Sequence, residues 1–195
     1  SVVANLWGAA KYTLDGGSWT DLTTASGNVG VFNANEWYEV KIIYDATKDE
    51  KIRFYVNGEL TNTLVRTATD TVDTLKMYVG KFDNNFTDFY LDDLTIVEEG
   101  IDEIVYMDFE DTANGTAPAG WALNSSTNAT LAVQEVRGNR VMVINHTGTS
   151  GNVQPYFALG NTYEKLTLSY SFCMPDNTGG YYLLTPATPS WGVKT

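Results

Sequence analysis

Apolar and polar residues alternate with period two along most of this chain, and this alternation constrains its fold more than any other feature. The segments 38–44, 52–57, 75–79 and 165–172 all place aromatic or aliphatic residues at every second position, with mostly polar residues between them. Period two is the repeat of a β-strand that buries one face, whereas a helix needs apolar residues at spacings of three and four. No stretch of the chain sustains the helical spacing. The sequence therefore predicts an all-β fold with negligible helix.

Turn residues separate the alternating segments. Asn57-Gly58 stands between Val56 and Leu60, and both turn residues tolerate the positive φ angles that a two-residue hairpin requires. Further clusters of turn-forming residues occupy segments 15–17, 137–139, 148–151 and 177–180. Short strands with one apolar face and dense turns predict two packed antiparallel sheets, a β-sandwich.

Composition narrows the class of partner and the compartment. The 195 residues are 43% hydrophobic, which is enough for a core, and carry a net charge of −12. The 12 basic residues are scattered, which argues against nucleic acid as a partner and against binding to an anionic membrane. No apolar run is long enough to span a membrane, so we expect no membrane insertion. Cys173, the only cysteine, lies in an apolar run, where a buried and inert thiol is expected.

Short motifs resemble a known family of sandwich modules. Trp37-Tyr38 is followed by the segment 54–58, Phe-Tyr-Val-Asn-Gly, and later by the segment 90–94, Tyr-Leu-Asp-Asp-Leu. This succession resembles the laminin-G-like, or concanavalin A-like, jelly-roll family, whose last strand often carries an Asp-Asp pair. The resemblance implies a jelly-roll sandwich and places Trp37 and Trp121 in its core.

A second set of motifs resembles the first strand of such modules. Asp108-Phe109-Glu110 with Gly120-Trp121 ten residues further on looks like the family's opening strand and loop. It is also similar to the opening strand of calcium-containing sandwich modules that are appended to xylanases and related glycosidases. The order of the two halves is therefore permuted relative to the family.

This order predicts one sandwich assembled from two half-repeats. Residues 1–97 would be the closing half of one repeat, residues 98–104 a short linker, and residues 105–195 the opening half of the next. First and last strands are neighbours in such sandwiches, so the short linker can join them. The halves can close within one chain, or each can be completed by a neighbouring chain. The sequence leaves this choice, the oligomeric state and the parent protein open.

Four acidic residues should meet where the first and last strands lie side by side. They are Asp92, Asp93, Asp108 and Glu110. Clustered carboxylates suit Ca²⁺, which takes six to eight oxygen ligands, so a structural calcium site is one interpretation. The other is an acidic group satisfied by hydrogen bonds. Alternation places Asp92 on the face of Leu94, hence inward.

Aromatic residues near the two chain ends are candidates for sugar binding. We single out Trp7, Trp19, Tyr182 and Trp191, with Asn5 as a polar neighbour. Trp and Tyr rings stack on the apolar face of a pyranose, and amide side chains bind its hydroxyl groups. Packing in the core or in loops is the alternative for each ring.

The function expected from these features is non-catalytic. We expect an extracellular module of a secreted or cell-surface bacterial protein that binds carbohydrate weakly through a concave sheet. A structural spacer or adhesin repeat, in contact with neighbouring repeats of the same polypeptide, is the first alternative. A polysaccharide lyase or hydrolase is the second, although the chain lacks the alternating carboxylates of jelly-roll glucanases. His146, the only histidine, is expected at the surface or in a turn. The sequence does not name the glycan.

Overall fold

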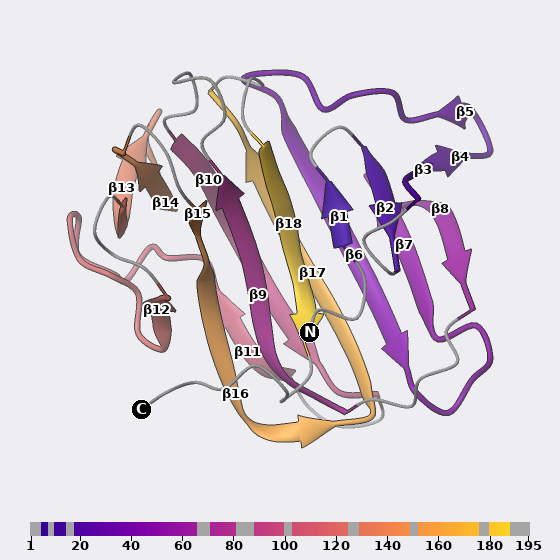
Figure 1. Cartoon of the computed structure of the whole chain (residues 1–195). Coiled ribbons are helices and arrows are strands. Elements are labelled where there is room, and N and C mark those ends of the chain that lie inside the picture. The colour runs from indigo at the N-terminus through magenta and orange to yellow at the C-terminus, as the bar shows by residue number, and fades with distance from the viewer. Residues whose placement is uncertain are drawn as a thin grey trace.

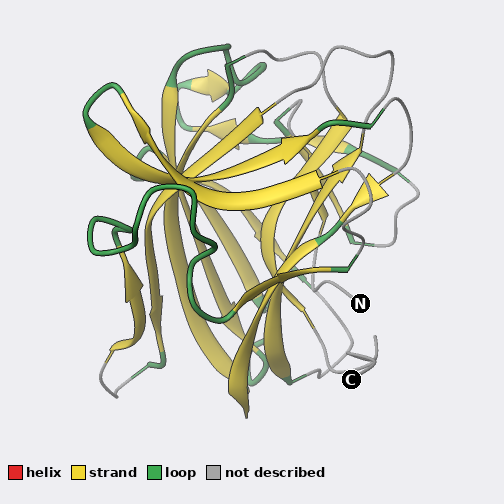
Figure 2. Ribbon diagram, turned by 90° about the vertical axis from the view of Figure 1, so that its left-hand side faces the viewer, coloured by secondary structure: helices red, strands yellow, loops and turns green. Residues whose placement is uncertain are grey.

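The computed structural model describes a defined set of residues, and every statement below refers to them. They are residues 5–7, 10–14, 18–65, 71–80, 88–99, 103–124, 129–148, 152–175 and 180–187, with the backbone alone described at 5–7, 80, 152 and 180–182. These residues form strands, turns and loops but no helix (Figure 2). Accordingly, none of the described segments is a helix that could span a membrane. The predicted all-β fold is confirmed.

Two large sheets form a sandwich, with the front sheet nearest the viewer in Figure 1. In spatial order the front sheet contains β12 (Trp121–Leu123), β16 (Pro155–Tyr163), β9 (Val72–Gly80), β18 (Gly180–Ala187), β1 (Asn5–Trp7), β2 (Lys11–Thr13) and β3 (Thr20–Asp21), with β15 (Asn152–Val153) also pairing with β9.

The back sheet is of the same size. In spatial order it contains β13 (Ala129–Val136), β14 (Asn139–His146), β10 (Asp88–Val97), β17 (Lys165–Cys173), β6 (Trp37–Asp45), β7 (Ile52–Val56) and β8 (Glu59–Leu64), with β11 (Glu103–Met107) also pairing with β10. A separate small ribbon joins β4 (Thr23–Thr24) and β5 (Gly27–Asn28). Every strand pair is antiparallel, as the alternation predicts.

Both sheets combine strands from two stretches of sequence, residues 1–97 and residues 105–195, and in each sheet one strand of the second stretch lies between two strands of the first. In the back sheet β17, from the second stretch, lies between β10 and β6, from the first. In the front sheet β18 lies between β9 and β1 in the same way (Figure 1). The described strands of one chain therefore complete both sheets together. The origin of the two stretches as half-repeats stays a prediction.

The core between the sheets is built by the inward residues of the alternating strands. Phe172 of β17 is fully buried, and its ring stacks on Phe89 of β10 at a centroid distance of 5.5 Å. Phe32 and Tyr38 contact the same ring at 5.0 and 5.6 Å. Burying one aromatic ring of this size contributes roughly 2–3 kcal/mol. Phe172 thus joins rings from the other stretch of sequence into one aromatic cluster.

The hairpin predicted at Asn57-Gly58 is present between β7 and β8. Both residues have positive φ, 49° and 79°. The backbone N–H of Asn57 donates to the Glu39 carbonyl, and the Asn57 side-chain oxygen accepts from the Glu39 N–H, both at 2.9 Å. The turn is therefore also fastened to β6.

The glycine of the proposed opening motif, Gly120, leaves space that the Phe157 ring occupies. Gly120 has φ of 81°, and a Cβ atom placed there would lie 2.5 Å from Cε2 of Phe157. Any side chain at this position would push Phe157 away from Trp121, whose ring lies 5.7 Å from that of Phe157. Phe109 of the same motif is buried as well.

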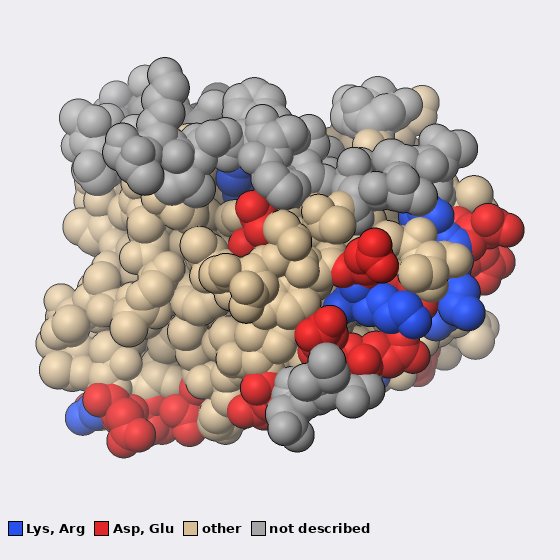
Figure 3. All heavy atoms as spheres, turned by 90° about the horizontal axis from the view of Figure 1, so that it is seen from below, with Lys and Arg blue, Asp and Glu red and all other residues tan. Residues whose placement is uncertain are grey.

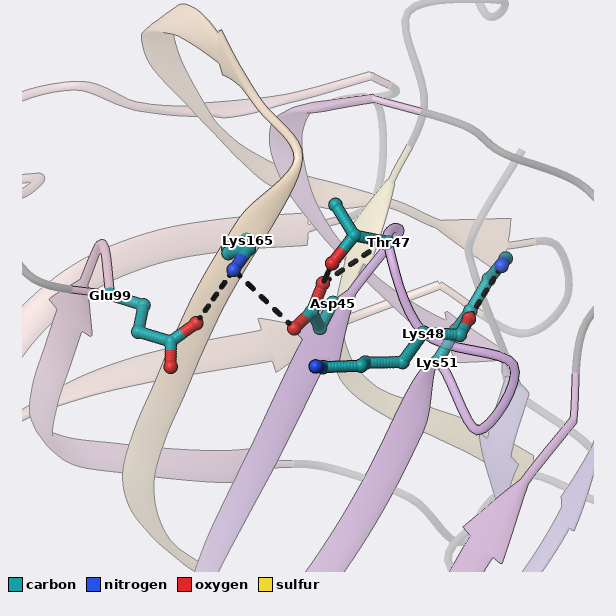
Figure 4. A network of polar contacts seen from close by, with 6 residues as sticks. All are labelled: Asp45, Thr47, Lys48, Lys51, Glu99 and Lys165. Atoms are coloured by element: carbon teal, nitrogen blue, oxygen red, sulfur yellow. Dashed lines mark hydrogen bonds and ion pairs between the residues drawn. The ribbon is translucent and has the colours of Figure 1, made fainter.

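Ion pairs connect the segment after β10 to the last residue of β6 and the first residue of β17. Nζ of Lys165 lies 3.2 Å from a carboxylate oxygen of Glu99 and 3.7 Å from one of Asp45 (Figure 4). These carboxylates, Glu99 first, raise the pKa of Lys165. Water and salt screen such exposed ion pairs, so they contribute little to stability. Figure 3 shows acidic groups beside most of the basic ones at this end of the molecule, which argues against a continuous basic patch there.

We expect Phe172→Ala to lower the free energy of unfolding by about 3–5 kcal/mol, because it removes the ring shared by the two stretches and leaves a cavity. Urea denaturation followed by tryptophan fluorescence measures this. Thr167→Ala, on the outer face of the same strand, is the matched control and should change stability by less than about 0.5 kcal/mol. Equal effects of the two substitutions would contradict the described core.

Candidate functional site

The acidic residues singled out from the sequence lie where β10 changes its neighbour. Residues 88–91 of β10 pair with β14, and residues 94–97 pair with β11. Between these two sections the pairing with β17 shifts, and Asp93 adopts a φ of 51°. A shift of this kind is a β-bulge, which bends a strand and re-aims its side chains.

Asp92 is buried at this bulge, as predicted, but for a different reason. Strict alternation groups Asp92 with Leu94, whereas the bulge turns Leu94 into the core and leaves Asp92 opposite Ser171 on the outer face. The prediction that these two residues share a face was wrong. Asp92 is only 5% exposed because the β13–β14 hairpin lies beside it: Asn139 donates to its Oδ2 at 2.6 Å.

The environment of Asp92 favours its neutral form. Burial is the main cause, and the nearby Asp93 and Glu110 add repulsion, so the pKa of Asp92 rises to about 6. The Asp93 N–H, which donates to Oδ1 at 2.9 Å, and the Asn139 amide oppose this rise. Both carboxylate oxygens of Asp92 therefore have donors within the protein.

Asp108 and Glu110 also have donors within the protein. Asp108 accepts a hydrogen bond from the Glu110 N–H at 3.2 Å, and Glu110 accepts one from the Arg140 N–H at 2.9 Å. Within the described ranges, no three His, Cys, Asp or Glu side chains form a group that could hold a metal ion. The arrangement fits the hydrogen-bonded alternative more closely than a preformed calcium site. Calcium binding through Asp92, Asp93, Asp108 and Glu110 stays a prediction.

The backbone brings together two of the aromatic residues proposed for sugar binding. Trp7 of β1 lies directly opposite Tyr182 of β18, and Tyr182 in turn lies opposite Tyr78 of β9. Asn5 lies opposite Thr13. Trp19 directly precedes β3 and is partly buried, whereas Trp191 lies outside the described residues. The ligand-binding role of these five predicted residues stays a prediction.

The outer face of the back sheet carries a second aromatic row, whose side chains are described. Cross-strand partners lie on the same face of a sheet, so the register defines a continuous line across five strands. This outer row, in spatial order, is Tyr55, Lys41, Ser169, Thr95 and Tyr106. Nζ of Lys41 lies 4.7 Å from the centre of the Tyr55 ring, and Tyr106 is 54% exposed. Two aromatic rings thus flank a floor of short hydroxyl side chains, which Thr167 and Ser171 extend along β17.

A hollow of about 270 Å³ lies on this face at the start of β6. Its lining consists of Asn35, Trp37, Tyr90, Val136, Arg137, Asn139 and Cys173. Trp37, Cys173 and Tyr90 are consecutive cross-strand neighbours on β6, β17 and β10. The hairpin between β13 and β14 supplies the polar wall.

Trp37 does not occupy the core position that the family resemblance implies. It is 41% exposed, because it has the same parity on β6 as Glu39 and Lys41. The period-two pattern alone indicates this outward position, and the resemblance obscured it. Trp121, in contrast, is 7% exposed and packs in the core as expected.

The polar groups of the hollow are held in place. Asn139 is bound to Asp92, and the Asn35 side chain donates to the Pro175 carbonyl at 3.0 Å. Burial raises the pKa of Cys173, so its thiol is neutral and a poor nucleophile, as the sequence predicts. The arrangement is suited to binding a ring.

His146 departs from its predicted surface position. It is the last residue of β14 and is 2% exposed, on the face that Met142 and Ile144 turn into the core. A histidine buried in this way is not available to a solvent-exposed substrate.

Sequence reasoning missed the aromatic residues of the outer face. Tyr55, Tyr106, Trp37 and Tyr90 lie far apart in sequence, and only the strand register brings them onto one surface. Their outward parity was the available signal, because each stands between inward apolar residues or beside charged outward ones.

Asp92 should make stability depend on pH. Its folded-state pKa of about 6 lies above the ordinary 3.8, so the folded state binds this proton more tightly, and its contribution to stability falls as pH rises from about 4 through 6. Two pKa units correspond to at most about 3 kcal/mol. We expect the stability difference between the wild type and Asp92→Asn to shift in favour of the variant over this range, measured by thermal melts. A difference that stays constant with pH would contradict the assignment. Thermal melts at neutral pH test the calcium prediction: Ca²⁺ should raise the melting temperature and EDTA should lower it. A melting temperature that neither changes would contradict calcium binding.

Comparison with known protein families agrees with the β-sandwich fold. A search of curated proteins found no match to this chain. Residues 6–101 match the family Laminin_G_3, described as the concanavalin A-like lectin/glucanases superfamily. The matched part contains both the Trp37-Tyr38 motif and the Asp-Asp strand from which the resemblance was read. The match of residues 6–101 to the concanavalin A-like lectin/glucanases superfamily is consistent with a laminin-G-like jelly-roll module.

Proposed function

We propose that this chain is a non-catalytic module that binds carbohydrate weakly through the outer face of its back sheet. The observation that carries the proposal is the outer row, in which Tyr55 and Tyr106 flank the hydroxyl groups of Ser169 and Thr95. The match of residues 6–101 to a superfamily of concanavalin A-like lectins and glucanases supports it.

The chemistry of the row matches that of a sugar chain. A pyranose has an apolar face of C–H groups, which packs on an aromatic ring, and a rim of hydroxyl groups, which exchange hydrogen bonds with Ser, Thr and Lys side chains. Tyr106 is 54% exposed, and thus available for stacking. Antiparallel strands stand about 4.8 Å apart, so the five strands of the row span roughly 19 Å, enough for several sugar units.

Weak binding follows from the openness of this face. The outer row is formed by side chains on an open sheet surface, so a sugar chain bound there would remain largely exposed to water. Specific ligand sites usually enclose most of the ligand surface, and affinity falls where they do not. Modules of this kind gain useful affinity when several copies act together, which accords with a tandem arrangement in a longer polypeptide.

The absence of catalysis is part of the proposal. A glycosidase needs two carboxyl groups roughly 5–9 Å apart across a cleft, one of them with a raised pKa that can reach the substrate. Asp92 has the raised pKa, but it is 5% exposed and both its oxygens accept hydrogen bonds from the protein. Its properties are those of a structural residue that positions Asn139.

We further propose an extracellular location in a secreted or cell-surface bacterial protein, with neighbouring repeats as further partners. The acidic, threonine- and asparagine-rich composition supports this. A spacer or adhesin repeat without a glycan ligand would share these features, so binding itself must decide between the two.

Affinity gel electrophoresis on a panel of polysaccharides tests the proposal. We expect retardation on at least one glycan, and Tyr106→Ala should weaken it about tenfold because it removes an exposed stacking ring, a loss near 1.4 kcal/mol. Val31→Ala, which truncates an exposed residue outside the row, is the matched control and should leave binding unchanged. Folded protein that no glycan retards would overturn carbohydrate binding and favour the spacer.

A further inference from the structure

The hollow on the back sheet differs in charge from the rest of the molecule. The chain has 24 acidic and 12 basic residues, yet among the described residues that line the hollow only Arg137 is charged. Burial raises the pKa values of Tyr90 and Cys173, and at Tyr90 the Asp88 carboxylate adds to this rise. The charge of Arg137 opposes the rise at both residues, so Arg137 lies close enough to influence the walls. A cation thus stands at the edge of an aromatic hollow in an acidic protein.

The backbone fixes where Arg137 stands. Arg137 and Gly138 form the two-residue turn between β13 and β14, with φ of 54° and 86°. Positive φ at both positions defines a tight hairpin turn of the rigid type that joins twisted strands. Asn139, the next residue, is anchored to Asp92 at 2.6 Å. The guanidinium group is therefore carried by a turn whose base is held against β10.

Acidic side chains near the hollow have partners of their own. Glu36 accepts hydrogen bonds from Tyr38 at 2.8 Å and from Asn33 at 3.0 Å. The Asp88 carboxylate accepts one from the side chain of Asn145, and Asp92 accepts one from Asn139. None of the three lines the hollow.

The volume of the hollow suits one ring. About 270 Å³ is slightly below the range of roughly 300–1,000 Å³ that is usual for drug-sized ligands. Trp37 and Tyr90 offer ring surfaces, and the amides of Asn35 and Asn139 offer donors and acceptors for hydroxyl groups. Arg137 adds a planar cation, whose geometry matches a carboxylate through two parallel hydrogen bonds.

We propose that this hollow is a subsite for a carboxylate-bearing sugar, a hexuronate unit, with Trp37 beneath the ring and Arg137 paired with its carboxylate. The inference rests on the proposed function, because it names the class of sugar that the same face prefers. The hollow and the outer row lie on one face, so a single sugar chain can occupy both.

Isothermal titration calorimetry with oligomers of galacturonate, glucuronate and mannuronate, each against the corresponding neutral hexose oligomer, tests this. We expect at least one hexuronate oligomer to bind at least tenfold more tightly than its neutral counterpart, with a preference that falls as salt rises. Arg137→Gln should abolish the preference for the hexuronate oligomer, whereas Trp37→Ala should weaken the binding of both kinds of ligand. Lys48→Gln is the matched control and should keep the preference. It also removes one exposed cation, but Lys48 follows the last residue of β6, whereas Trp37 is the first.

The outcomes separate the two proposals. Binding of neutral oligomers without preference for any of the three hexuronates would overturn the subsite and leave the carbohydrate-binding function standing. A preference that survives Arg137→Gln would also overturn the subsite. No binding of either kind by folded protein would overturn the proposed function, and the subsite with it.

Discussion

The position of β17 between β10 and β6 is the constraint on which the rest of the structure depends. β17 comes from the second stretch of the sequence and pairs along its whole length with β6, from the first. Its inward face supplies Phe172 and Tyr170 to the core, and its outward face supplies Ser169 and Ser171 to the surface. One strand therefore joins the two stretches, fills the aromatic cluster and forms the floor of the proposed binding face.

The β-bulge at Asp92 and Asp93 supports this face. The bulge at Asp92 and Asp93 allows the first part of β10 to pair with β14 and its last part to pair with β11. It therefore joins β10, from the first stretch of the sequence, to two strands of the second. Asp92 fixes Asn139, and Asn139 adjoins the turn that carries Arg137. Burial of a carboxylate costs free energy, and here the hydrogen bonds to Asp92 offset only part of that cost, as its raised pKa shows, while they order one wall of the hollow.

Much of the fold could be predicted from the sequence, because period-two alternation and Asn-Gly turns act locally. The alternation of 38–44 and 165–172 predicts which residues face inward, and Asn57-Gly58 predicts the hairpin. The bulge could not be predicted, since nothing in Asp92-Asp93 itself signals a shift of register. The outer row could not be predicted for a related reason: Tyr55 and Tyr106 belong to one row only through four strand pairings. For Trp37 the local pattern was the better guide than the family resemblance.

The claim that the outer face of the back sheet binds carbohydrate can be tested most directly by mapping the site. Amide chemical-shift changes in ¹⁵N-labelled protein, recorded while a retained oligosaccharide is added, report which strands contact it. The account predicts that shifts concentrate on Lys41, Thr95, Tyr106, Arg137 and Ser169. Shifts confined to front-sheet residues such as Lys11 and Tyr78, or no shifts at all, would contradict it.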